Sequence, residues 1–493
     1  MPETKNTYQQ ILKSTALFGG VQVFTIIISI IRSKFIAIFM GSFGMGISGM
    51  LLSTLNLISG ITILGLENSA VKFISENKSN YEKQSKIVIV LRKILWLTGC
   101  IGAIIMIVFA PEISYITFGD RAYSSSFQWI SLALLFKQLS VGELVVLQGL
   151  QKLKPLAMAN LLGSFVGLLV SIPIYCYYKL EAIVPTIIIS SAFGLLFSYY
   201  FSRKIEIQKT TVTSRMLVTE GKEMVKLGII MSISSILTLV TLYALQIYIE
   251  KNGNLSEVGF YNAGFTLLNS YVGIIFSSMA TDYFPRLSAV NKNPIQINKI
   301  VTEQTVIAVL IITPIIVMFE IFTPTVVTIF FSKEFIAIVP MISIGILGML
   351  FRAVSWSMGY IILAKGDSKI FVWNALGFNL LFFVLHSYAY LNYGLQGLGI
   401  AFLIYYIFHL LVIMIEVKVK YNFKYDKNFL IIYNYSILIC VSAYLINTVH
   451  SLMLKTLLFI IIAMLSLWYS ISQLNKKINL KTVLHNFVAK FKK

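Results

Sequence analysis

The chain has 493 residues, of which 57% are hydrophobic and only 12% are charged, and its mean hydropathy is +0.82. This composition excludes a soluble globular protein, in which about 25% of the residues are charged. The formal net charge of +20 does not indicate a nucleic-acid partner, because the positions of the lysines and arginines follow membrane topology.

An apolar run of about 20 residues is long enough for a helix to cross the hydrocarbon core of a bilayer. Fourteen such runs follow one another, and they predict an all-α polytopic membrane protein with about fourteen transmembrane helices. The runs are centred near residues 27, 57, 99, 137, 167, 193, 236, 270, 311, 350, 381, 407, 439 and 464.

The 40 lysines and arginines indicate the orientation of the chain. With the N-terminus inside and fourteen alternating spans, most of them fall on cytoplasmic segments. This asymmetry follows the positive-inside rule and predicts that both termini are cytoplasmic. The tail KKINLKTVLHNFVAKFKK (476–493) is then either an amphipathic helix on the anionic inner leaflet or a solvated basic segment. The outside segments carry only Arg121, Lys179, Lys251, Lys333 and Lys455.

The chain contains an internal repeat at a nearly constant offset of 213 to 215 residues. Segment 41–61 matches 254–274, and LFKQLS (135–140) matches LFRAVS (350–355). The individual matches include Gly46 with Gly259, Leu55 with Leu268, Asn56 with Asn269, Lys137 with Arg352, Asn160 with Asn374 and Gly163 with Gly377.

The repeat predicts three regions. Residues 1–213 form an N-terminal lobe of six spans, and residues 214–427 form a C-terminal lobe of six spans. Residues 428–493 add two further spans and the basic tail. Because each lobe has an even number of spans, the lobes run parallel, and we expect a central cavity between them.

Four cations fall inside the predicted spans. Lys137 lies at the centre of LALLFKQLSVGELVVL (132–147), and its repeat partner Arg352 lies about 18 Å deep, counted from Pro340 at about 1.5 Å per residue. Arg32 and Lys34 lie in the first span. Each such cation costs about 2.5 to 3.5 kcal/mol to insert, so we expect a water-filled cavity that binds an anion. The alternative is that these side chains snorkel outward or pair with an acid, such as Glu143 or Glu320.

Four further residues are candidates for supporting roles. Trp356, one turn after Arg352, is placed to stack on a sugar or on the guanidinium, or to pack in the core or against lipid. Glu143 is placed to neutralise Lys137 or to carry a coupling proton or sodium ion. Asp282 and Arg286, spaced i and i+4, form either an inner gate or a pair that pins a helix end.

No catalytic or metal site is predicted. Cys100, Cys176 and Cys440 all fall inside apolar spans, as small packing residues do. The longest outside segment, around PEISYITFGDRAYSSS, is short and offers no acid/base set for glycan chemistry. We therefore expect a protein that is not an enzyme and needs no cofactor.

Three segments carry a family resemblance: RSKFIAIFMGSFGMGISG (32–49), VGFYNAGFTLLNSYVGIIFSSMATDYFPRLSAV (258–290) and FRAVSWSMGYIILAKGDSKIF (351–371). They resemble the O-antigen translocases, which are Wzx-type flippases of the multidrug/oligosaccharidyl-lipid/polysaccharide (MOP) exporter superfamily. The resemblance implies two parallel six-helix bundles around a V-shaped cavity. It also implies transport of undecaprenyl-pyrophosphate-linked oligosaccharide between leaflets of the bacterial inner membrane.

The resemblance places Arg32 and Arg352 at basic positions of the first and tenth helices of such flippases. Many members have proline where this chain has Ser357, so the resemblance does not extend to a proline hinge there. The expected partners are the lipid-linked oligosaccharide, membrane lipids and the polysaccharide polymerase machinery.

We expect alternating access, with the pyrophosphate bound in the cationic cavity and the cycle coupled to protons, sodium ions or the membrane potential. Two alternatives share the fold. A lipid II-type flippase differs only in its cargo, whereas a MATE-like drug or ion antiporter calls for an acid-lined pocket.

Overall fold

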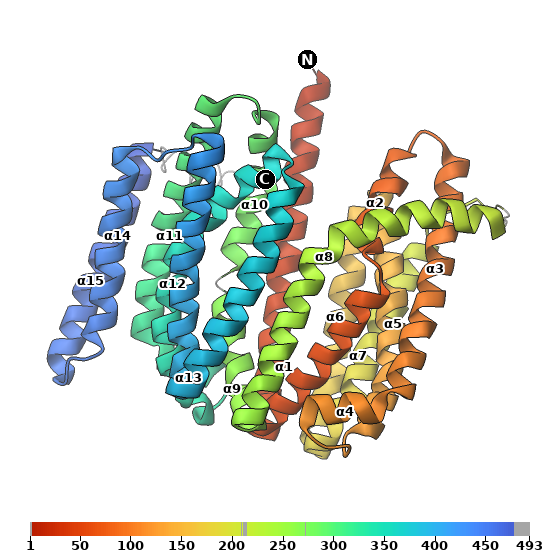
Figure 1. Cartoon of the computed structure of the whole chain (residues 1–493), viewed down its shortest axis with the longest axis horizontal. Helices are drawn as coiled ribbons and strands as arrows, with labels where there is room; N and C mark the ends of the chain where they lie inside the picture. Colours follow the sequence, from red (N-terminus) through yellow and green to blue (C-terminus); the bar gives the residue numbers. More distant parts are fainter. Residues whose placement is uncertain (1, 209, 211–213, 272, 478–493) are drawn as a thin grey trace. The chain divides into compact units, whose positions relative to one another are not determined.

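A computed structural model describes residues 2–208, 210, 214–271 and 273–477, and the regular structure in these ranges is helical throughout (Figure 1). The predicted basic tail therefore lies, from residue 478 onward, outside the described residues. The all-α, polytopic fold class predicted from the hydropathy pattern is confirmed.

The packing divides the chain into two compact units. Unit 1 comprises Met1–Asn262 and Phe330–Glu334, and unit 2 comprises Ala263–Ile329 and Phe335–Lys493. Unit 1 contains α1 (Pro2–Thr62), α2 (Leu66–Glu76), α3 (Tyr81–Val108), α4 (Ala110–Phe118), α5 (Ser124–Gly149), α6 (Leu153–Tyr178), η1 (Lys179–Ala182), α7 (Ile183–Arg203), α8 (Ser214–Asn252) and most of α9 (Leu255–Phe265). Unit 2 contains η2 (Thr266–Tyr271), α10 (Ile274–Ala289), α11 (Pro294–Phe330), most of η3 (Lys333–Ile338), α12 (Val339–Lys365), α13 (Ser368–Tyr421), α14 (Lys427–Ile446) and α15 (Leu452–Lys477).

The boundary between the packing units lies later in the chain than the boundary between the predicted repeats. Helix α8, which begins the second repeat, packs against α1, α2 and α3 of unit 1. The packing units and the sequence repeats are two different divisions of the chain. The division into lobes 1–213 and 214–427 therefore stays a prediction.

Ten helices of the described residues are long and apolar enough to cross a membrane. Three of these stretches each contain two of the predicted span centres: Val23–Thr62, Leu153–Arg203 and Ser368–Tyr421. The centre near 270 falls in the short π-helical segment η2, between α9 and α10. All fourteen predicted centres therefore lie in helices, but the eighth span is not one continuous α-helix.

Glycines mark the points where the two longest helices turn back. Gly41 in α1 has φ 66° and ψ −163°, and Gly394 in α13 has φ 56° and ψ −141°. Side chains with a Cβ disfavour a positive φ, whereas glycine adopts it readily. Each of these helices is thus two successive spans joined by a tight turn.

Helices α1 and α9 cross at a pair of glycines that the repeat relates to each other. A Cβ on Gly46 would lie 1.9 Å from the carbonyl oxygen of Leu255, and a Cβ on Gly259 would lie 1.9 Å from that of Ser42. Only the absence of both side chains lets the two backbones touch.

The end of unit 1 near α2 has an apolar core that fixes the position of α5. Leu66, Ala70 and Ile74 lie four residues apart on α2 and are fully buried. They pack with Val145 and Val146 of α5, together with residues of α3 and α8. Burial of each large aliphatic side chain contributes about 1.5 to 3 kcal/mol. In Figure 1, α3, α5, α6 and α7 run side by side and extend below the level of α2.

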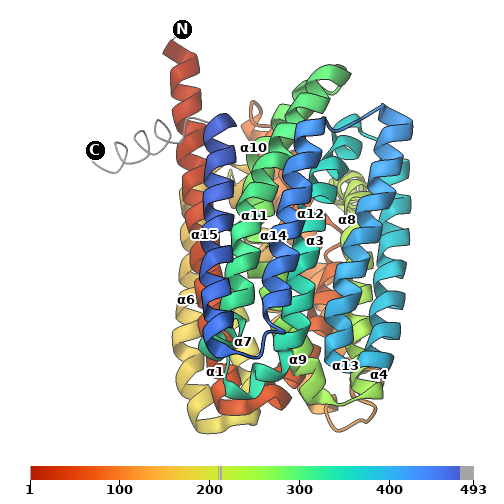
Figure 2. The same ribbon diagram turned by 90° about the vertical axis from the view of Figure 1, so that its left-hand side faces the viewer.

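In unit 2, the two C-terminal helices pack on α11. Val317 of α11 forms a cluster with Ile439 and Ala443 of α14, and Ile462 and Ala463 of α15 pack against it (Figure 2). Helix α12 runs without a break through Ser357. The hydroxyl of that residue donates to the carbonyl oxygen of Ala353 at 3.0 Å, so the position is an ordinary helical turn.

Candidate functional site: two cations held by asparagines

Lys137 of α5 is hydrogen-bonded to an asparagine of α1. Its Nζ donates to Oδ1 of Asn56 at 2.5 Å, and the side chain is half-buried. A hydrogen bond from a charged donor contributes about 1.5 to 3 kcal/mol, which offsets part of the cost of a cation inside the membrane. Because an amide is neutral, this hydrogen bond does not remove the positive charge.

Lys137 and Asn56 line a cavity of about 290 Å³ between α1, α5, α6 and α7. Arg32 of α1 lines the same cavity, and its Nε is buried without a hydrogen-bond partner among the described residues. The structure thus brings two of the predicted cations to one place within unit 1. No aspartate or glutamate is among the described residues that line the cavity. Its other polar side chains include Ser48, Ser140, Asn160, Ser164, Ser190 and Ser191.

Unit 2 contains a matching arrangement around Arg352 of α12. Nη1 of Arg352 donates to Oδ1 of Asn269 at 2.5 Å. The guanidinium carbon lies 5.4 Å from the ring centres of both Phe276 and Tyr406. Aromatic faces attract a cation through their quadrupole, and the contacts that the described residues make with the arginine include no carboxylate.

The two contacts are equivalent under the sequence repeat. Lys137 matches Arg352, Asn56 matches Asn269, and each cation donates to its own asparagine at the same distance. The sequence indicates the asparagines only as identities of the repeat and not as site residues. Their recurrence in both halves of the chain, at nearly the same offset as the cations, is the signal in the sequence that points to them.

The third matched position, Asn160 with Asn374, has different surroundings in the two units. Asn160 and Gly163 line the cavity of unit 1. Asn374, the repeat partner of Asn160, instead donates from Nδ2 to Oε2 of Glu416 at 2.7 Å.

Trp356 packs in an aromatic cluster of α10 and α12. Its ring centre lies 5.5 Å from that of Phe276, 5.7 Å from Tyr283 and 5.1 Å from Tyr360. Phe276 therefore contacts both Trp356 and the guanidinium of Arg352. Phe276 thus connects the cluster to the arginine, and the role of Trp356 toward a sugar stays a prediction.

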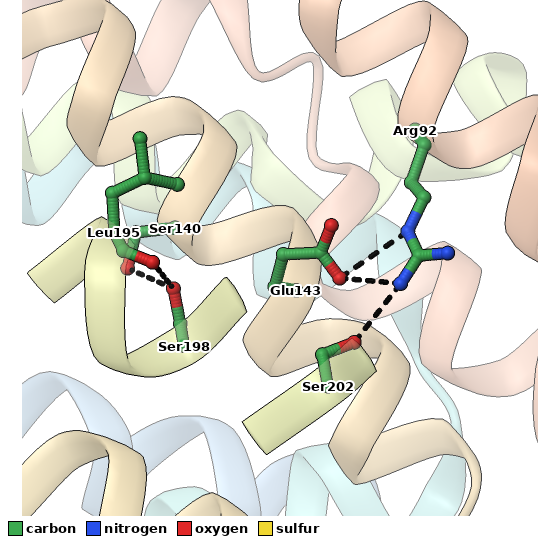
Figure 3. A network of polar contacts seen from close by, with 6 residues as sticks. All are labelled: Arg92, Ser140, Glu143, Leu195, Ser198 and Ser202. Carbon is green, nitrogen blue, oxygen red and sulfur yellow. Dashed lines mark hydrogen bonds and ion pairs between the residues drawn. The ribbon is translucent and has the colours of Figure 1, made fainter. Parts of the chain in front are cut away.

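Glu143 pairs with Arg92 of α3 and not with Lys137. Oε2 of Glu143 accepts from Nη2 of Arg92 at 2.6 Å and from its Nε at 3.2 Å. Nη2 also donates to the hydroxyl of Ser202 on α7 at 3.0 Å (Figure 3). Residues six apart on an α-helix point about 120° away from each other, which explains why Glu143 and Lys137 face different neighbours. The expectation that Glu143 neutralises Lys137 is therefore corrected.

The remaining predicted residues are not among those that line the cavity of unit 1. Lys34 is half-buried on α1 and is not one of the lining residues. Asp282 and Arg286 form an ion pair on α10, with Oδ2 and Nε 2.8 Å apart and side chains 73% and 49% exposed. An exposed i, i+4 pair of this kind contributes little to stability, and its role as an inner gate stays a prediction.

The chain matches known proteins in sequence and in fold. Residues 42–340 match the family described as polysaccharide biosynthesis protein. A putative O-antigen transporter of Shigella flexneri is 23% identical over 352 residues, which cover 70% of this chain and 82% of that protein.

Two solved structures share the fold. The lipid II flippase MurJ in an inward closed conformation superposes with a TM-score of 0.66 and 14% identity, over 95% of this chain and 99% of that one. An inward-facing MATE family transporter of the MOP superfamily superposes with a TM-score of 0.65 and 13% identity, over 81% and 95% of the two chains. These relatives are transporters and flippases rather than enzymes. Because the family match covers more than half of its length, the chain belongs to the polysaccharide biosynthesis protein family, with the all-helical fold of MOP superfamily transporters.

Proposed function

We propose that the protein is a flippase that moves an undecaprenyl-pyrophosphate-linked oligosaccharide, an O-antigen or related repeat unit, from the inner to the outer leaflet. The observation that carries this proposal is the repeated cation–asparagine pair, Lys137 with Asn56 and Arg352 with Asn269. Each unit holds an intramembrane cation by a neutral group and so keeps its charge for an anionic ligand.

The chemistry of the cargo fits these sites. A pyrophosphate with attached sugars cannot enter hydrocarbon, whereas a polyprenyl tail is soluble in it. Lys137 and Arg32 supply charge and donors for phosphate oxygens in the cavity of unit 1, and its serines and asparagines supply hydrogen bonds for hydroxyl groups. Arg352 contributes a planar guanidinium, which suits phosphate oxygens.

The driving force follows from the charge of the cargo. Moving one negative charge outward across a membrane that is negative inside is favourable by about 2.3 kcal/mol per 100 mV. A proton or sodium gradient is the other means of resetting the cycle. Flipping rates measured in vesicles with an imposed potential, and then with each ion gradient, separate these three modes.

The topology expected for this function is a multi-pass protein of the bacterial inner membrane with both termini in the cytoplasm. Its product, presented at the outer face, is the substrate of a polysaccharide polymerase. The polymerase machinery and the surrounding lipids are thus its proposed partners.

The relatives support a lipid-linked glycan as cargo more than a drug. One is described as an O-antigen transporter, and a fold neighbour is described as a lipid II flippase. A cationic drug would be repelled by a cavity that contains two basic residues and no described acid. Leaflet assays with lipid II and with undecaprenyl-pyrophosphate oligosaccharide distinguish the two flippase activities.

Charge removal tests the proposal. Lys137→Ala and Arg352→Ala are each expected to lower surface glycan by at least about tenfold at unchanged protein levels in the membrane, because each loses a charged contact to phosphate. Arg352→Lys keeps the charge and should retain part of the export. Lys93→Ala, which removes an exposed lysine of α3, is the matched control and should export normally. Full export by the double variant Lys137→Ala/Arg352→Ala overturns the proposal.

A further inference from the structure

A further cavity in unit 1 is a groove between α3, α5 and α7. It has a volume of about 540 Å³, and its walls are mainly apolar. Trp96, Leu196 and Tyr199 line it and are 60%, 57% and 49% exposed. Such large exposed side chains on the outside of a transmembrane bundle face lipid acyl chains, so this groove is open to the bilayer.

The groove and the cation cavity lie on different faces of the same two helices. On α5, Phe136 and Leu139 line the groove, whereas Lys137 and Ser140 line the cavity. On α7, residues 192, 195, 196, 199 and 203 line the groove, whereas 190, 191 and 194 line the cavity. The groove is therefore a separate site, and its ligand need not be the proposed cargo.

One end of the groove carries two arginines. Arg203, the last residue of α7, is exposed, and its guanidinium carbon lies 4.7 Å from the ring centre of Tyr199. Arg92 uses Nε and Nη2 for Glu143 and Ser202, and in Figure 3 its third nitrogen points away from both partners. That nitrogen, Nη1, makes no hydrogen bond to the described residues. With Glu143 counted, this end of the groove has a net positive charge.

We propose that this groove binds one anionic phospholipid from the leaflet on the lysine-rich side, which the charge asymmetry predicts to be cytoplasmic. Its phosphate lies between Arg203 and Nη1 of Arg92, and an acyl chain lies along Phe136, Leu139 and Leu196. The combination is suited to a lipid because guanidinium groups match phosphate oxygens and the apolar floor continues into the bilayer. A soluble anion would make no favourable contact with the apolar residues that line the groove.

The local fluorescence of Trp96 tests this proposal. The full-length protein is prepared with Trp96 as its sole tryptophan, the other four being replaced by phenylalanine, and is reconstituted in vesicles. Phosphatidylglycerol and phosphatidylcholine with brominated acyl chains are then compared as quenchers. We expect phosphatidylglycerol to be preferred roughly tenfold, the effect of one charged hydrogen bond to phosphate.

Two matched variants distinguish a specific lipid-binding site from ordinary contact with surrounding lipid. Arg203→Gln should abolish the preference for phosphatidylglycerol. Lys204→Gln, which removes the adjacent exposed charge outside the groove, should keep it. Equal quenching by the two lipids, or equal preference in the two variants, overturns the proposal and leaves only an annular lipid contact.

A second measurement uses protein that keeps all five native tryptophans. Phosphatidylglycerol that remains bound after detergent purification is counted by native mass spectrometry. Arg203→Gln should retain at least one bound phosphatidylglycerol fewer than Lys204→Gln does. Equal retention in the two variants contradicts the proposed site.

Discussion

The amide oxygens of Asn56 and Asn269 determine how much charge each site presents. A carboxylate in the same place would accept the same hydrogen bond and would also cancel the cation. Asparagine satisfies one donor of Lys137 or Arg352 and leaves the field of the charge in place. An amide in place of an acid therefore leaves each cation with its charge, which the proposed phosphate binding requires.

Asn56→Asp and Asn269→Asp test this distinction. If the cations bind phosphate, each substitution is expected to lower glycan export on the order of tenfold or more, because it neutralises the site. Asn56→Gln, which keeps an amide, should be less harmful. Export is measured as surface glycan at equal protein levels. Normal export by the aspartate variants would show that the pairs only hold the helices together.

Helices α3, α5 and α7 are joined by the network of Arg92, Glu143 and Ser202 (Figure 3). The side chains of Arg92 and Glu143 are only 17% and 8% exposed, so each depends on the other for compensation of its charge. This network ties together the three helices that form the groove lined by Trp96, Leu196 and Tyr199, and two of them, α5 and α7, also line the cation cavity.

Glu143→Gln leaves Arg92 without its counter-charge and should lower the free energy of unfolding by about 1 to 3 kcal/mol. The midpoint of thermal unfolding of the purified protein measures this loss. The matched control is Glu112→Gln. Its carboxylate lies 4.0 Å from Arg121 with side chains 54% and 71% exposed, and its removal should change little. An equal effect of both substitutions would refute a stabilising role of the network.

The crossing of α1 and α9 provides a second prediction at the scale of elements. Gly46→Ala would place a Cβ against the carbonyl oxygen of Leu255, and the forced separation should cost about 1 to 3 kcal/mol. Gly359→Ala, in α12, has nothing within 4 Å of the new Cβ and should be neutral or slightly stabilising. Accumulation in the membrane and thermal stability are compared for the two variants. Equal stability of the two would contradict a tight crossing.

For the whole molecule, the charge asymmetry predicts which side of the membrane each end of a helix occupies. Lys251, at the end of α8, is expected outside, and Lys292, between α10 and α11, is expected inside. Lys251→Cys and Lys292→Cys are introduced after the three native cysteines are replaced by alanine. An impermeant maleimide added to intact cells should label only the first variant, and permeabilised cells should label both. The reverse pattern would invert the topology.

Much of the architecture can be predicted from the sequence because the bilayer acts on each segment separately. A run of about 20 apolar residues forms a span whatever its neighbours are, so all fourteen predicted centres fall in helices. The repeat, with its matched Lys137 and Arg352, is likewise visible in the sequence alone. The break at η2 was not predicted, because hydropathy does not distinguish a π-helical segment from a regular helix.

The partners of the buried charges depended on tertiary structure. Glu143 pairs with Arg92, 51 positions earlier in the chain, and not with Lys137 on its own helix. Lys137 donates to Asn56, 81 positions earlier in the chain, and Arg352 donates to Asn269, 83 positions earlier. The spans, the charge asymmetry and the repeat are thus properties of the sequence, because they depend on composition over short segments. Which side chains meet depends on how each helix is rotated about its axis, and only the packing of all its neighbours determines that rotation.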